Sequence, residues 1–276
     1  MSFRMTSLAT TTMNQLQQKL DTIGHNLANS NTAGYKERQA EFSDILSQQI
    51  DNLTPANQAG PRLTPDGIRQ GIGSRLGAIN NKLDMGSIQK SERELDNVLL
   101  QENHLFQVQA EHNGVEEVQY TRDGIFYLHP TGTGDNVMLV TKEGQPILGQ
   151  NGPIEFSAQQ VTKIQMDDDG SVLVQRNNQP EWETVGILAL TEALLPRSLE
   201  AVGDNQFRVP DELNETDILQ AVAPEGQLLE NGAVEMSNVS IQDQMTEMIN
   251  AQRSYQMNAR TVTMGDEMQG LVNQLR

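Results

Sequence analysis

The chain has 276 residues, a net charge of −18 at neutral pH, 4% aromatic residues and no cysteine. The lack of cysteine excludes disulfides and thiol chemistry, and the acidity argues against a nucleic-acid partner, because phosphate contacts need clustered Lys and Arg. No segment approaches the roughly 18 consecutive apolar residues of a membrane span, so we expect no membrane insertion.

The first segment has the apolar spacing of a helix. Met13, Leu16, Leu20, Ile23 and Leu27 repeat at intervals of three and four residues, which is the spacing of a coiled-coil seam. The turn formers of residues 29–34 end in a glycine and are expected to stop this helix. The same stretch lacks the apolar run of about 7–15 residues of a cleavable secretory signal, so we expect export by another route.

The next region is expected to be irregular. Residues 38–50 are compatible with a short helix or an extended arm, and the sequence leaves both open. Residues 52–77 contain three prolines and five glycines, which predicts a long connection without regular structure. Connections of this length are uncommon in compact domains and are often functional.

The middle of the chain has the pattern of an antiparallel sheet or a small barrel. Short apolar runs recur between turn signals such as Arg122-Asp123-Gly124 and Asp168-Asp169-Gly170, which indicates strands joined as hairpins. The runs are Leu105–Val108, Val118–Tyr120, Ile125–Leu128, Val137–Val140, Ile164–Met166, Val172–Val174 and Val185–Leu190.

The last forty residues again predict a helix. Ile241, Met245, Met248, Gln252, Tyr255, Ala259 and Val262 keep a heptad-like spacing, and Met264, Met268, Leu271 and Leu275 continue it on a shifted stripe. A drifting stripe is expected where a helix meets several neighbours. The helix would be about 50 Å long, which exceeds the diameter of a β domain of roughly 130 residues. The two helical stripes are therefore expected to cover each other and then neighbouring chains, rather than only the chain's own β domain.

Enzymatic chemistry has little support in the sequence. The four histidines lack metal-ligand spacing, and Asp167–Asp169 lack the alternating ligands and closing Glu of a calcium loop, so a hairpin turn is expected there. The Gly71–Ser74 stretch is too short for a phosphate loop, and no nucleophile elbow is present. We expect no catalytic residues, cofactor or metal.

These patterns predict an α+β fold, with long N- and C-terminal helices that pair as a coiled coil and an inserted antiparallel β domain. We expect residues 1–34 and 236–276 to form a helical assembly domain. Residues 35–84 and 220–235 would be an extended connecting region, and residues 85–219 the β domain. The ends are close to neutral while the middle carries most of the negative charge, which suits ends that associate and a solvated middle.

Motifs at both ends resemble those of flagellar rod, hook and related axial proteins. Residues 21–36, DTIGHNLANSNTAGYK, resemble the family core "NNLANxNTxGYK". Residues 237–258 resemble the family's "SNV…EMxxMIxAQRxYxxN" motif, and Asp266-Glu267-Met268 matches its usual ending. Two independent motifs in the right order at opposite ends make the resemblance specific.

Interior segments narrow the resemblance to the distal rod. Residues 64–73 are similar to a segment that distal rod proteins carry after the first helix, and residues 120–126 resemble "YTRDGxF". The family's "DVAIxGxGFF" run is replaced by residues 95–106, LDNVLLQENHLF, which implies a different turn there. A glycine-tyrosine stretch that members often carry is absent from residues 1–10.

The resemblance implies a self-assembling structural subunit of the hollow rod that transmits torque from motor to hook. Its expected partners are copies of itself, other rod and hook proteins and the flagellar export apparatus, and its expected location is the basal body outside the cytoplasmic membrane. The alternatives are a proximal rod paralogue, a hook-like or cap-like axial protein and, least favoured, a cell-wall hydrolase with axial ends. The expected assembly residues are Met13, Leu16, Leu20, Ile23, Leu27, Asn29, Asn31, Thr32, Gly34, Tyr35, Ser237, Asn238, Val239, Ile241, Met245, Met248, Gln252, Arg253, Tyr255, Asn258, Met268, Leu271 and Leu275.

Overall fold

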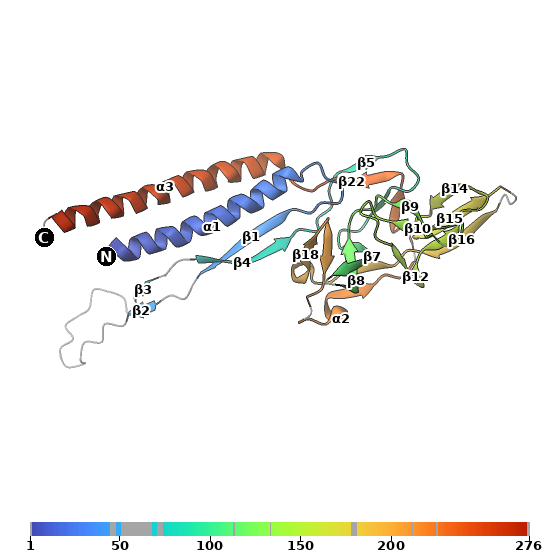
Figure 1. Cartoon of the computed structure of the whole chain (residues 1–276), viewed down its shortest axis with the longest axis horizontal. Coiled ribbons are helices and arrows are strands. Elements are labelled where there is room, and N and C mark those ends of the chain that lie inside the picture. The colour runs from blue at the N-terminus through green and yellow to red at the C-terminus, as the bar shows by residue number, and fades with distance from the viewer. Residues whose placement is uncertain are drawn as a thin grey trace. The chain divides into compact units, whose positions relative to one another are not determined.

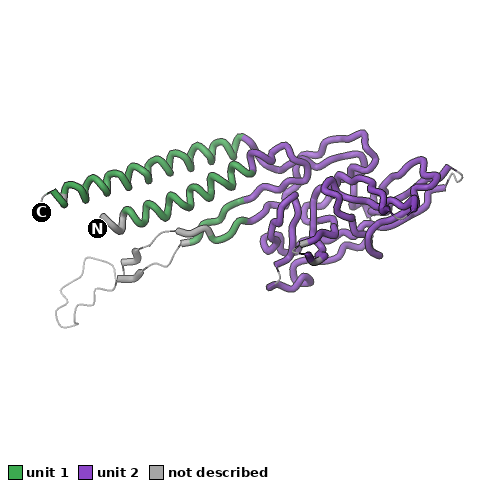
Figure 2. The backbone as a smooth tube through the Cα atoms, viewed as in Figure 1, with its two compact units in different colours: residues 1–25, 39–79, 242–276 green, residues 26–38, 80–241 purple. Residues whose placement is uncertain are grey.

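The computed structural model describes residues 2–44, 48–50, 68–70, 74–112, 114–132, 134–177, 181–210, 212–224 and 226–274. The chain forms two compact units, shown in Figure 2. Unit 1 contains residues 1–25, 39–79 and 242–276, and unit 2 contains residues 26–38 and 80–241. The fold is α+β, with an N-terminal helix, a β-rich unit and a C-terminal helix, as the sequence predicts.

The two long helices lie side by side and run in opposite directions in unit 1 (Figure 1). Helix α1 spans Ser2–Ala28 and α3 spans Ile241–Gln274. Lys19 Nζ lies 3.1 Å from Glu247 Oε2, and a Cβ atom added to Gly265 would lie 2.7 Å from Thr6 Cγ2. The start of α1 therefore lies near the end of α3, so the two helices pair antiparallel. Among the described residues, no helix is long and apolar enough to cross a membrane.

Residues 38–44 adopt the extended alternative rather than the helical one. Strand β1 (Arg38–Asp44) pairs with β4 (Ser74–Asn81), and β2 (Gln48–Ile50) pairs with β3 (Ile68–Gln70). Most of the predicted irregular connection, including the distal-rod-like residues 64–67 and 71–73, lies outside the described residues.

Unit 2 is built from short strands, and the described ladders between them are antiparallel. Its largest sheet has six strands in the order β18-β19-β8-β7-β17-β20. Those strands are β18 (Glu200–Gly203), β19 (Gln206–Arg208), β8 (Val115–Thr121), β7 (His104–His112), β17 (Leu190–Ala193) and β20 (Leu219–Ala221). A 3-10 turn (Pro196–Ser198) and the short helix α2 (Glu215–Ile218) lie in its connections.

Smaller sheets complete the unit. They are β9 (Tyr127–Pro130), β10 (Asn136–Val140) and β13 (Glu155–Ser157); β14 (Val161–Met166), β15 (Ser171–Arg176) and β16 (Trp182–Ile187); and the pairs β11 (Leu148–Gly149) with β12 (Gly152–Pro153), β6 (Asn97–Leu99) with β21 (Leu229–Asn231), and β5 (Ile88–Lys90) with β22 (Ala233–Glu235). The predicted run 185–190 is divided between β16 and β17. The predicted Asp168–Gly170 turn joins β14 to β15, with Gly170 at φ +89°.

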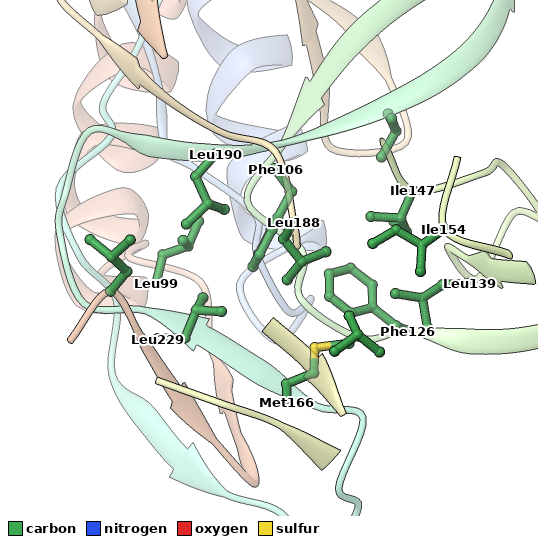
Figure 3. Close-up of a cluster of buried hydrophobic side chains, with 13 residues drawn as sticks. Leu99, Phe106, Phe126, Leu139, Ile147, Ile154, Met166, Leu188, Leu190 and Leu229 are labelled. Atoms are coloured by element: carbon green, nitrogen blue, oxygen red, sulfur yellow. The ribbon is translucent and has the colours of Figure 1, made fainter. Parts of the chain in front are cut away.

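Two hydrophobic clusters lie on the two faces of β7. Alternate side chains of a strand point to opposite faces, so Phe106 and Val108 enter one cluster while Leu105 enters the other. In the first cluster the rings of Phe106 and Phe126 meet edge to face, 5.1 Å apart (Figure 3). This arrangement lets the aliphatic, aromatic-poor sequence bury a core around one central strand.

Candidate functional site

Three charged side chains meet inside unit 2, and we call them the charged junction. Glu235, at the end of β22, accepts from Lys36 Nζ at 2.7 Å on Oε1 and from Arg122 Nε at 2.6 Å on Oε2. The side chains of Lys36, Arg122 and Glu235 are 1%, 0% and 2% exposed. Because buried charges are costly unless paired and hydrogen-bonded, this geometry must hold for unit 2 to be stable.

A loop of backbone carbonyls surrounds the Arg122 guanidinium. Its Nη1 group donates to the carbonyls of Gln101, Glu102 and His104, and Nη2 donates to that of Leu99 at 2.9 Å. These carbonyls lie in the segment that departs from the family's glycine-containing run. The different turn expected there is therefore a loop that closes around one arginine.

Burial and neighbouring charges shift the pKa values of Glu235 and Lys36. Burial alone would raise the pKa of Glu235, but Arg122 and Lys36 outweigh it, and the pKa is lowered. Burial lowers the pKa of Lys36 despite the attraction of Glu235. Lys36 Nζ also donates to the Asp84 carbonyl at 2.6 Å, and the Gly86 amide donates to Glu235 Oε1 at 2.8 Å. Backbone groups thus provide further hydrogen bonds to Lys36 and Glu235, in addition to the ion pairs.

Two asparagine side chains hold the segment next to Lys36. Asn26 Oδ1 accepts from the Arg38 amide at 3.0 Å while its Nδ2 donates to the Arg38 carbonyl at 2.9 Å. Asn238 Oδ1 accepts from the Glu37 amide at 2.7 Å, and its Nδ2 donates to the carbonyls of Lys82 and Asp84. Each amide therefore acts on the backbone as a neighbouring strand would.

Glycine is required where the chain leaves the first helix. Gly34 has φ +67°, and a Cβ atom there would lie 2.7 Å from Asp123 Cα. Its amide donates to the Glu235 carbonyl at 2.8 Å. The left-handed conformation and the close approach both favour the residue without a side chain.

Helix α3 carries a second set of candidate residues. Its buried positions are Gln244, Ala251 and Gly265, which are separated by multiples of seven and face α1. Successive residues on a helix are about 100° apart, so side chains one position away lie on the flanks of this buried register. We use the term α3 flanks for six exposed apolar side chains that lie outside this buried register. They are Met245, Ile249, Met257, Met264, Met268 and Leu271, of which Met257 is 70% exposed.

The ends of this chain match two family models. The model described as flagella basal body rod protein matches residues 8–36, and that described as flagellar basal body rod FlgEFG protein C-terminal matches residues 230–275. The chain is 38% identical over 273 residues to the flagellar hook-basal body complex protein FlhP of Bacillus subtilis, covering 97% of both chains. The chain belongs to the flagellar basal-body rod protein family.

Other relatives in this family cover nearly the whole chain as well. The flagellar basal-body rod protein FlgG of Bacillus subtilis is 32% identical over 268 residues, covering 95% of both chains. FlgG of Caulobacter vibrioides is 29% identical over 260 residues, covering 94% of both chains. The family resemblance proposed from the motifs is confirmed.

The rod-family motifs come together at the charged junction. The N-terminal motif supplies Lys36, the "YTRDGxF" segment supplies Arg122, and the segment before the C-terminal helix supplies Glu235. Of the expected assembly residues, Gly34, Tyr35, Ser237 and Asn238 lie in unit 2 next to this junction, and Tyr35 Oη donates to Asn26 Oδ1 at 3.0 Å. Asn29, Asn31, Thr32 and Val239 lie in the same segments.

The other expected assembly residues lie on the long helices. In α1, Ile23 is buried, and Met13, Leu16, Leu20 and Leu27 are half-buried. In α3, Met248, Tyr255 and Asn258 are half-buried in the register that faces α1. Ile241, Met245, Gln252, Arg253, Met268 and Leu271 are exposed, and Leu275 lies outside the described residues.

Sequence reasoning did not select Asn26, Lys36, Arg122 or Glu235 as site residues. Their signal was present, since all four lie in segments quoted for the family resemblance or beside them. Among the described residues there is no group of three or more His, Cys, Asp and Glu side chains that could hold a metal.

Proposed function

We propose that this chain is a structural subunit of the bacterial flagellar basal-body rod that joins neighbouring subunits through α1 and α3. The observation that carries the proposal is the set of α3 flanks, whose apolar side chains are about half-exposed or more within one chain. Fully burying a Met, Ile or Leu side chain contributes about 1.5–3 kcal/mol, so half-exposed ones gain roughly half of that on docking. Six such side chains provide a substantial driving force for association.

The position of the flanks supports contacts with more than one neighbour. Met245 follows the buried Gln244, whereas Met264 precedes the buried Gly265, so apolar side chains lie on both sides of the register that faces α1. Paired helices with apolar flanks on both sides suit a tube wall, where each pair meets neighbours to left and right. In the assembled state α1 and α3 would interlock as a coiled coil, with seams that include the expected assembly residues.

The proposed assembly contains residues 1–34 and 236–276 at the tube wall, residues 35–84 and 220–235 as the connection, and residues 85–219 as the β domain outside. Copies of the chain, other rod and hook proteins and the export apparatus are its proposed partners. Its proposed location is the basal body. The torque of the motor would pass through the wall of paired helices to the hook.

Within the rod, we place the chain at the distal end. The alternative is a paralogue with the role of FlhP. The 38% identity to the Bacillus subtilis protein of that name supports this alternative. Expression of the chain in Bacillus subtilis strains that lack either FlgG or FlhP distinguishes the two, because a distal rod subunit restores swimming to the first strain and not to the second.

Truncation and electron microscopy test the proposed function. Removal of residues 245–276 should abolish assembly and motility while unit 2 stays folded, because unit 2 contains none of those residues. Basal bodies purified from the parent strain should contain the chain in many copies. A truncated chain that still builds a functional rod would contradict the proposal, as would basal bodies without the chain.

A point variant sharpens the test. Met257→Asp places a charge on the α3 flank, and Gln256→Asp places the same charge on an exposed polar position beside it. Only the first should prevent assembly, since it would bury an unpaired carboxylate between subunits. Equal assembly of the two variants would show that this flank is not an interface.

A further inference from the structure

Methionine dominates the exposed apolar surface of α3. Met245, Met257, Met264 and Met268 are each half-exposed or more, and we call these four the methionine face. The whole chain has 12 methionines and no cysteine, so thioethers are its only sulfur groups. A thioether that meets solvent is open to oxidants dissolved there.

The oxidation is a balanced oxygen transfer. A sulfur lone pair attacks one oxygen of a hydroperoxide, a sulfur–oxygen bond forms, and the oxygen–oxygen bond breaks. The proton of the transferred oxygen passes to the second oxygen, which leaves as water or, from an alkyl hydroperoxide, as an alcohol. The sulfur is oxidised to a sulfoxide and the peroxide is reduced. The product is a polar, chiral group in place of a flexible apolar one.

Unit 2 contains an internal reference. Met166 is 1% exposed and packs in the cluster around Phe106 and Phe126, and its Sδ accepts from Asn97 Nδ2 at 2.9 Å. Peroxide can reach this sulfur only when unit 2 opens. The chain therefore holds methionines of opposite accessibility in one molecule.

We propose that the methionine face is an oxidation site that controls whether the subunit can assemble, which rests on the proposed function. Before assembly all four side chains are half-exposed or more. A sulfoxide carried into a subunit contact must bury an S=O group, and burying a polar group without a partner opposes association. Several sulfoxides in one helix would cancel the gain from the apolar flanks. In the assembled rod the same sulfurs would be covered, so only the unassembled subunit would be sensitive to oxidation.

The test uses the purified full-length chain and hydrogen peroxide. Peptide mass spectrometry follows sulfoxide formation at each methionine, and sedimentation follows assembly with and without peroxide. The methionine face should oxidise at least about tenfold faster than Met166, and the oxidised chain should lose most of its sedimenting fraction. Methionine sulfoxide reductase should restore assembly.

A matched variant keeps the shape of the helix and removes the sulfur. Leu replaces Met at all four positions with little change of volume, and the variant is compared with itself: the fraction that sediments without peroxide should be retained after peroxide. Circular dichroism checks that its helix content is unchanged, and variants with single Met257→Leu or Met264→Leu changes should show partial resistance.

Three outcomes would overturn the proposal. They are oxidation of Met166 as fast as the methionine face, full assembly of a chain that carries the four sulfoxides, and loss of assembly in the peroxide-treated leucine variant. Failure of the untreated parent chain to assemble would instead count against the proposed function, and the relative oxidation rates would still be measured.

Discussion

Arg122 Nε lies 2.6 Å from Glu235 Oε2 in the interior of unit 2, although 113 residues separate them in the sequence. The pair ties the turn after β8 to the strand that leads into α3, and Lys36 adds the segment that leaves α1. The segment that follows α1 and the strand that precedes α3 therefore meet at one buried carboxylate.

Replacement of Glu235 by Gln should destabilise unit 2 by about 3 kcal/mol, because it leaves Arg122 and Lys36 as buried cations without a counter-charge. Urea unfolding followed by near-ultraviolet circular dichroism measures the change. Glu183→Gln is the control, since Glu183 pairs with Arg176 at the surface and is 54% exposed. That variant should lose less than about 0.5 kcal/mol. Equal losses in the two variants would show that the junction contributes no more than a surface pair.

Acid should weaken unit 2 through the same carboxyl. The pKa of Glu235 in the folded chain lies below its ordinary value of 4.5. The unfolded chain therefore binds the proton more readily, and the stabilisation is complete above pH 4.5 and is lost as the pH falls through the folded pKa. In Glu235→Gln this part of the acid dependence should be missing. Parallel stability curves of parent and variant below pH 4.5 would contradict the assignment.

Gly34→Ala should cost about 2–4 kcal/mol, because it combines the strain of a left-handed backbone with overlap against Asp123. Gly144→Ala is a matched control, with φ +87° and no atom within 4 Å of the new Cβ. It shares the strain and lacks the overlap, so the difference between the two variants isolates the close approach. Thermal unfolding of both variants measures it, and identical midpoints would place the whole effect in the backbone.

Gly265→Leu should separate α1 from α3, whereas Gly270→Leu in the same helix should not. A Cβ at residue 265 would meet Thr6 Cγ2, and one at residue 270 would meet nothing within 4 Å. Both changes raise helix propensity by up to about 1 kcal/mol, so only packing differs. Because the chain has no cysteine, spin labels on cysteines introduced at residues 19 and 247 report the interhelical distance. An unchanged distance in Gly265→Leu would show that this approach is not needed for pairing.

Local chemistry accounts for the features that could be predicted from the sequence. The turn formers after Ala28 end α1, Gly34 at the end of this stretch has a positive φ, and the Asp168–Gly170 turn closes a hairpin. In each case the deciding contacts lie within a few residues. The split of run 185–190 into two strands was not predictable in this way, because the break is set by pairing with different neighbours, β15 and β7.

The charged junction was beyond such reasoning, because its three charges come from segments far apart in the chain. The buried face of α3 was also hard to predict from hydrophobicity. Gln244, Ala251 and Gly265 are small or polar, and they face α1 because close approach of two helices favours small side chains. Of the predicted stripe, Met248, Tyr255 and Val262 are half-buried, whereas Met245 and the later Met264, Met268 and Leu271 are exposed within one chain, and their role in an assembly stays a prediction.

The membership of residues 26–38 in unit 2 has a practical consequence for fragment design. A recombinant piece that begins at residue 80 would lack Lys36 and the Asn26 amide, leaving a vacant slot beside β22. A synthetic peptide of residues 26–38 should bind such a piece and restore its cooperative unfolding, as in split-protein complementation. The β-rich unit is therefore a two-piece fold carried on one chain.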